Sequence, residues 1–140
     1  MNLTKKELPL VILTGHRKSG TSVFHRLFDG VNGVNLYPTD LTVLYAYFSC
    51  FTLKKNVSNN ELKERLLHVV KSSMEYSAKQ GLDLTSKNHF LNVFESEIQK
   101  IDITNKSDVI NSICNSWLKS KEVESKTDPL IVKETSQAIF

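Results

Sequence analysis

Residues 15–22 combine two glycines with cationic and hydroxyl side chains, in the order Gly-His-Arg-Lys-Ser-Gly-Thr-Ser. Glycine lets the backbone N–H groups of a tight loop turn toward an anion. Arg17 and Lys18 add positive charge in the same loop, and Thr21 and Ser22 are residue types that often begin a helix. The free N–H groups at a helix start favour a phosphate-like group. The spacing therefore predicts a phosphate-binding loop.

An apolar segment precedes this loop. Leu10–Leu13 has the sequence Leu-Val-Ile-Leu, which is short, apolar and partly β-branched, and it predicts a strand buried on both faces. Apolar residues at helical spacing after the loop predict a helix over residues 21–29, ended by Gly30. A strand, a loop and a helix in this order are the setting that a phosphate loop requires.

Gly15 and Gly20 have the spacing of a Walker A motif, Gly-x-x-x-x-Gly-Lys-[Ser/Thr]. Thr21, however, stands where that motif has lysine, and Lys18 lies two residues before the second glycine. The later apolar segment, residues 129–133, is followed by Glu134, so a Walker B aspartate is not evident there. A P-loop nucleotide-binding protein of the kinase or NTPase kind is kept as a second hypothesis.

Residues 14–22 resemble the 5′-phosphosulfate-binding loop of sulfotransferases, which reads Gly-x-Arg-Lys/Ser-x-Gly-Thr-[Thr/Ser]. The resemblance implies a P-loop-like fold and 3′-phosphoadenosine-5′-phosphosulfate (PAPS) as the sulfate donor, without a metal. It implies Lys18 as a catalytic residue on the leaving-group side, where negative charge develops. A surface ion pair is the alternative for Arg17. The implied cofactor-binding residues are Arg17, Lys18, Ser19, Gly20, Thr21 and Ser22.

Asp40 lies 20 residues after Gly20, the spacing at which heparan-type sulfotransferases carry a glutamate that acts as general base. The resemblance implies Asp40 as the base toward a hydroxyl or amine acceptor, with a carbohydrate slightly favoured. Alternatively, Asp40 caps a helix predicted to run over residues 41–48. Lys133 lies in a segment similar to a Glu-Lys-Thr-Pro motif of the family, with acid and lysine reversed and no proline, and its role stays open.

The remaining pattern predicts the elements around these residues. A short strand over residues 34–37 is expected to end at Pro38, and residues 129–133 predict a second buried strand. Three amphipathic helices are expected between them, the first capped by Asn59 or Asn60, the second by Thr85 or Ser86, and the third over residues 107–119. The prediction is an α/β fold with a P-loop-like parallel sheet, flanking helices and a helical insertion, in a single domain over residues 1–140.

The family carries a further strand and an Arg…Ser site for the 3′-phosphate beyond the region that this chain resembles. The chain therefore resembles the N-terminal half of such an enzyme, and its sheet is expected to be incomplete. A catalytically inactive, truncated sulfotransferase is the third hypothesis.

Composition limits the classes of partner and compartment. The net charge of +3 is too mild to predict a nucleic-acid partner, and no apolar run is long enough for a membrane span or a signal segment, so a cytoplasmic protein is expected. The two cysteines lack metal-ligand spacing and are predicted to be buried free thiols. Trp117 is assigned to the core, with an acceptor-binding wall as the alternative. Three histidines are interpreted as packing or surface residues: His25, His68 and His89.

Overall fold

The computed structural model describes residues 9–15, 19–47, 57–81, 83–122 and 128–133. Three strands in this part of the chain form one parallel sheet in the order β1-β3-β2. The predicted α/β class with a parallel sheet is thus confirmed. The elements in chain order are β1 (Leu10–Leu13), α1 (Thr21–Arg26), β2 (Asn35–Asp40), the 3-10 helix η1 (Val43–Tyr47), α2 (Asn59–Lys79), α3 (Leu84–Ile98), α4 (Lys106–Ser120) and β3 (Leu130–Lys133).

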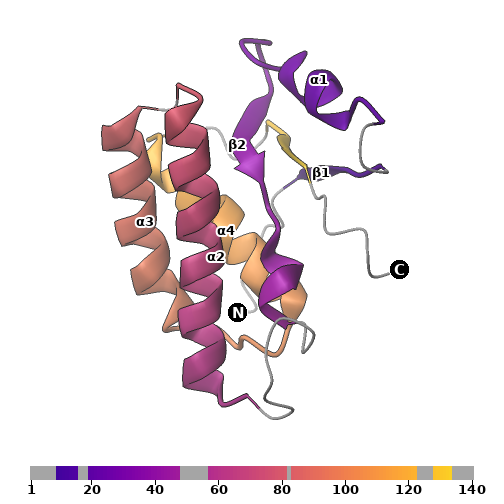
Figure 1. The fold of residues 1–140 in the computed structure, drawn as a ribbon. Coiled ribbons are helices and arrows are strands. Elements are labelled where there is room, and N and C mark those ends of the chain that lie inside the picture. The colour runs from indigo at the N-terminus through magenta and orange to yellow at the C-terminus, as the bar shows by residue number, and fades with distance from the viewer. Residues whose placement is uncertain (1–8, 16–18, 48–56, 82, 123–127, 134–140) are drawn as a thin grey trace, which may run out of the picture.

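The sheet separates α1 from the three long helices (Figure 1). Helix α3 packs on both α2 and α4, and α2 also contacts β2, whereas α1 contacts β3. Leu130 and Val132 of β3 belong to the main core, but the buried Ile131 and Lys133 do not. Since successive side chains of a strand point to opposite faces, Ile131 and Lys133 face α1.

An aromatic cluster forms the core between the sheet and the helices. The rings of Tyr37, Phe90 and Trp117 contact one another edge to face, with centroids 5.8–6.1 Å apart. The Trp117 indole N–H donates to the backbone carbonyl of Leu36 at 2.9 Å, which satisfies its polar atom. Trp117 is therefore a core residue, as predicted.

The structure describes one of the two cysteines. Cys114 is a buried free thiol, as predicted, and burial raises its pKa to about 12. A thiol with such a pKa is protonated at neutral pH and therefore a poor nucleophile. Cys50 lies outside the described residues.

The three amphipathic helices are confirmed, but the cap residues predicted for the first two are wrong. Ser58 caps α2 by accepting from the backbone N–H of Glu61 at 3.2 Å, and Asp83 caps α3 by accepting from Ser86 at 2.7 Å. Each of these helices begins earlier than predicted because Ser and Asp, like Asn, place a side-chain oxygen on the first free N–H groups.

Strand β2 continues through Pro38 to Asp40, so the prediction that Pro38 ends it is wrong. Proline is tolerated here because β2 is an edge strand and its pairing with β3 is irregular between Leu36 and Asp40. The helix predicted to begin directly after Asp40 is also wrong, since η1 begins only at Val43. Helix α1 ends at Arg26, before the predicted end at residue 29.

Strand β1 is less covered than predicted. Val11 and Ile12 are adjacent residues of β1 and point to opposite faces of the sheet, and they are 43% and 49% exposed. Among the described residues β1 pairs only with β3, and α1 contacts β3, the next strand in the sheet. An apolar run therefore forms an edge strand that is not buried on both faces.

Candidate functional site

The carboxyl ends of the three parallel strands meet at one edge of the sheet. In the strand register Lys133 of β3 lies opposite Leu13 of β1 on one side and opposite Asp40 of β2 on the other. The predicted phosphate-binding loop follows Leu13 directly along the chain. In α/β proteins, ligands bind at this edge of a parallel sheet. The topology thus brings together residues that are far apart in sequence.

Lys133 is the centre of this edge. Its side chain is buried, with 8% of the residue exposed, and its ammonium lies 2.6 Å from Asp40 Oδ1. The same ammonium donates to Ser22 Oγ on α1 at 2.5 Å. A buried ammonium requires such partners, because desolvation without them costs several kcal/mol. We call Ser22, Asp40 and Lys133 the strand-end cluster.

Gly15 and Gly20 stand at positions that are unfavourable for other residues, the first because of space and the second because of its backbone conformation. A Cβ on Gly15 would lie 2.6 Å from Thr21 Cγ2 and 2.7 Å from Ser19 Oγ, so the two ends of the loop approach closely there. Gly20, the residue before α1, has a φ of 83°, in the left-handed region that favours glycine. Both glycines therefore have a structural reason to be glycine. His16, Arg17 and Lys18 lie outside the described residues.

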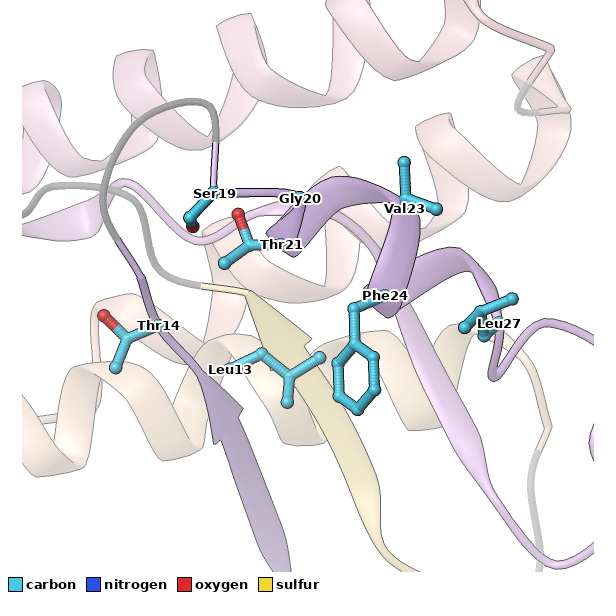
Figure 2. A pocket seen from close by; sticks show the side chains of 8 residues that line it. All are labelled: Leu13, Thr14, Ser19, Gly20, Thr21, Val23, Phe24 and Leu27. Carbon is cyan, nitrogen blue, oxygen red and sulfur yellow. The ribbon is translucent and has the colours of Figure 1, made fainter.

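An open pocket lies between β1, the described end of the loop and α1 (Figure 2). Its volume is about 700 Å³. Figure 2 shows Phe24 pointing from α1 toward Leu13, with the side chains of Ser19 and Thr21 above them. The pocket therefore joins an apolar floor to the hydroxyl-rich loop end. Its lining residues are Leu13, Thr14, Ser19, Gly20, Thr21, Val23, Phe24 and Leu27.

His25, for which the sequence predicted a packing or surface position, is the buried residue of α1. Only 5% of the residue is exposed, on the side of α1 that contacts β3. Among the described residues its Nε2 atom has no hydrogen-bond partner. Burial lowers the pKa of His25 below its ordinary value of 6.5, and the positive charge of Lys133 lowers it further.

The structure brings some of the predicted site residues together. Asp40 and Ser22 are joined through Lys133, whose role the sequence left open. Asp40 is the last residue of β2 rather than the residue before a helix. Ser19, Gly20 and Thr21 line the pocket.

The position of His25 in the sequence could have indicated that it shares a helix face with a predicted site residue. It lies three residues after Ser22, and residues at this spacing share one face of a helix. The prediction of a packing residue is correct as far as its burial is concerned. Its proximity to Lys133 depends on how α1 is placed on β3, which the sequence pattern does not specify.

Comparison with known proteins identifies no relative of the chain: no family model, no curated protein and no solved structure matches it. The part of the chain that the structure describes contains no helix long and apolar enough to cross a membrane. It also contains no group of three or more His, Cys, Asp or Glu side chains that could hold a metal ion.

Proposed function

We propose that the chain is a sulfotransferase-like protein that binds PAPS through residues 15–22 and transfers its sulfuryl group to a hydroxyl or amine acceptor. The observation that carries this proposal is the contact of Lys133 with both Asp40 and Ser22. One cation thereby links the residue expected to act on the acceptor with a residue expected to hold the 5′-phosphate. The loop sequence that follows β1 along the chain also contains two cationic residues, Arg17 and Lys18.

The residues present suit an anionic donor. Lys133 contributes a buried positive charge, and Ser19, Thr21 and Ser22 contribute hydroxyl groups at the start of α1. A Cβ at position 15 would crowd the side chains of Ser19 and Thr21, so the two ends of the loop lie close together there. Charge-assisted hydrogen bonds of this kind are the strong ones in anion recognition.

The proposed reaction assigns a role to each group. The acceptor oxygen or nitrogen forms a bond to sulfur, and the bond from sulfur to the bridging oxygen of the 5′-phosphate breaks. Asp40 accepts the proton of the acceptor, and Lys18 stabilises the negative charge on the bridging oxygen. Lys133 holds the Asp40 carboxylate at the sheet edge, and that side chain remains partly exposed to an incoming acceptor.

Binding of the desulfonated product nucleotide, 3′-phosphoadenosine 5′-phosphate (PAP), tests the proposal against a kinase or NTPase. Calorimetry should show that PAP binds and that ATP–Mg²⁺ does not compete, since Thr21 replaces the Walker A lysine. Binding of ATP–Mg²⁺ without binding of PAP would support the P-loop nucleotide-binding alternative instead.

Turnover separates an active enzyme from an inactive fragment. The protein should transfer labelled sulfate from PAPS to at least one member of a panel of hydroxyl and amine acceptors, including oligosaccharides. Lys18→Ala should lower turnover about 100-fold or more, the usual size for loss of one charge-stabilising group, while exposed Lys79→Met on α2 should not. PAP binding without turnover on any acceptor would support the truncated, inactive form.

A further inference from the structure

Exposed apolar side chains gather around β1 and α1. The described part of the chain exposes seven large apolar side chains, and six of them lie on β1, on α1 or shortly after α1. Figure 2 shows α1 beside β1, with apolar residues of both lining one pocket. Scattered exposed apolar residues are ordinary, whereas a gathered set indicates a surface that binds another protein. The six are Val11, Ile12, Val23, Phe24, Leu27 and Val31.

The outer edge of β1 presents main-chain groups to a further strand. Leu130 of β3 donates its N–H to the carbonyl of Pro9, and the register pairs Leu10 with Leu130. Successive residues of a strand direct their main-chain groups to alternate sides. Val11 therefore bonds to β3, whereas the N–H and C=O groups of Leu10 and Ile12 point away from it. Among the described strands β1 has no neighbour on that side.

The sequence of β1 does not protect this edge against another strand. Natural edge strands are protected by charge, proline or a bulge. Residues 10–13 are Leu-Val-Ile-Leu, without charge or proline, and they pair regularly with β3. Because Val11 and Ile12 are exposed on opposite faces, a strand that pairs here must itself be apolar on both faces. The β1 strand of a second copy has this property.

We propose that two copies of the chain associate through β1, as antiparallel neighbours in one continuous sheet. Leu10 of each copy pairs with Ile12 of the other, so the outward N–H and C=O groups of both residues form hydrogen bonds. Val11 of each copy then lies opposite Val11 of the other, on the two-fold axis. The same edge serves both copies, so the contact is isologous and association stops at a dimer.

The two-fold axis of this pairing is perpendicular to the sheet and leaves each face on its own side. Val11 is level with Ile131 in the register and therefore lies on the α1 face of the sheet. Val23 and Phe24 of both copies are thus brought to the same face as the Val11 pair. Because the two β1 strands run in opposite directions, the two strand-end clusters lie at opposite ends of the pair. The dimer therefore does not depend on what the cluster binds.

Sedimentation equilibrium of the parent chain between about 10 μM and 1 mM measures the association. A pair of four-residue strands buries less than a standard interface, so the dissociation constant should be weaker than about 1 μM. The mean mass should rise with concentration toward that of two chains and no further. Protein diluted below about 1 μM is then monomeric, and unfolding measured there reports the separate chain.

A charge at position 11 tests the contact across the axis. Val11→Lys places two like charges opposite each other and should keep the chain monomeric. Tyr76→Lys adds the same charge at an exposed apolar residue of α2, outside the interface, and should associate like the parent chain. Val11→Glu alone should also be monomeric, but an equimolar mixture with Val11→Lys should form dimers because opposite charges then meet. A mixture that stays as monomeric as its components would reject the pairing of Val11 with itself.

Amide hydrogen exchange distinguishes strand pairing from unspecific apolar association. The N–H groups of Leu10 and Ile12 should exchange rapidly in dilute protein and about fivefold or more slowly at about 1 mM. The N–H of Val11, which bonds to β3, should be protected at both concentrations. Ile12→Pro removes an outward N–H without removing a bond to β3 and should prevent the dimer. The charge variants decide the matter if this proline impairs folding.

A parent chain that stays monomeric up to about 1 mM would overturn the proposal. Protection of Leu10 and Ile12 at every concentration in that monomer would show that another part of the same chain covers the edge. Rapid exchange of both throughout would leave the edge to an unlike partner. Association that Val11→Lys does not weaken would also contradict the proposal. None of these outcomes depends on PAP binding, so failure of the dimer is distinct from failure of the proposed function.

Discussion

The two faces of the sheet differ in how they are covered. On one face, α2, α3 and α4 bury large side chains completely, Phe90 and Phe94 among them. On the other face lies only the short α1 among the described elements, and its Val23 and Leu27 are 68% and 66% exposed. The candidate site lies at the carboxyl edge of the sheet, on the α1 face. Folding stability and anion binding are therefore expected to depend on different parts of the molecule.

The difference also indicates how α1 is held in place. On the helical face, close packing of aromatic and aliphatic side chains fixes the elements. On the α1 face, the contacts to β3 include the hydrogen bond that Lys133 donates to Ser22. Such bonds respond to charge and pH, whereas apolar packing does not. Substitutions on the two faces should separate these modes of stabilisation.

The largest effect is expected from Phe90→Ala. Phe90 contacts the rings of Tyr37, Phe94 and Trp117, so truncation should lower the free energy of unfolding by about 3–5 kcal/mol. Phe24→Ala on α1, whose parent side chain is half exposed, should cost about 1 kcal/mol or less. Urea unfolding of both variants measures the difference. Equal losses would contradict the separation of the two faces.

Substitutions of the two partners of the ion pair, Asp40 and Lys133, should have smaller and unequal effects on the free energy of unfolding. Asp40→Asn leaves the buried Lys133 ammonium without its counter-charge and should lower the unfolding free energy by about 1–3 kcal/mol. Lys133→Met leaves a partly exposed carboxylate that water can solvate, so its cost should be below about 1 kcal/mol. Thermal and urea unfolding measure both. A larger loss in Lys133→Met than in Asp40→Asn would show that the ion pair does not control stability at this edge.

The pH dependence of stability should be weaker still. Because the pKa of His25 is lowered in the folded chain, its contribution is fully present above the unfolded value of 6.5. That contribution is lost as the pH falls below 6.5 and through the folded pKa, with a slope of at most about 1.4 kcal/mol per pH unit. Urea unfolding of the parent chain and His25→Gln across this range isolates it. Parallel curves for the two proteins would exclude a titrating His25.

The smallest effect is expected from Leu27→Ser on the exposed side of α1. The side chain is already in contact with water, so the unfolding free energy should change by about 0.5 kcal/mol or less. Val109→Ser on α4, whose parent side chain is fully buried, is the matched control and should be strongly destabilised. A comparable loss in Leu27→Ser would mean that this side of α1 is covered in solution.

Local sequence patterns predicted the positions of the helices and strands better than they predicted how each element is covered and paired. Helix α4 follows from an apolar stripe that includes Ile113 and Trp117, and such a stripe is a property of one segment. The coverage of β1 and the passage of β2 through Pro38 depend instead on strand order, because edge strands tolerate exposure and proline. Strand order is decided by long-range pairing, which a single segment does not contain.

In the candidate site, too, the part that is contiguous in sequence was predictable, and the contacts that depend on strand order were not. The loop at residues 15–22 is contiguous, and its glycines and cations are visible directly in the sequence. The contact between Ser22 and Lys133 spans 111 residues, and it exists only because β3 inserts between β1 and β2. Asp40 was a candidate from the resemblance to heparan-type sulfotransferases, but its pairing with Lys133 required the sheet register.

Equilibrium binding of PAP to the parent chain, Lys133→Met and Lys79→Met tests the central claim most directly. The parent chain and the exposed-lysine control should bind PAP with equal affinity and should not exchange it for ATP–Mg²⁺. Lys133→Met should bind about tenfold or more weakly, the loss expected for one charge-assisted hydrogen bond. Absence of PAP binding, or equal binding by Lys133→Met, would contradict the assignment of the strand-end cluster to a phosphosulfate site.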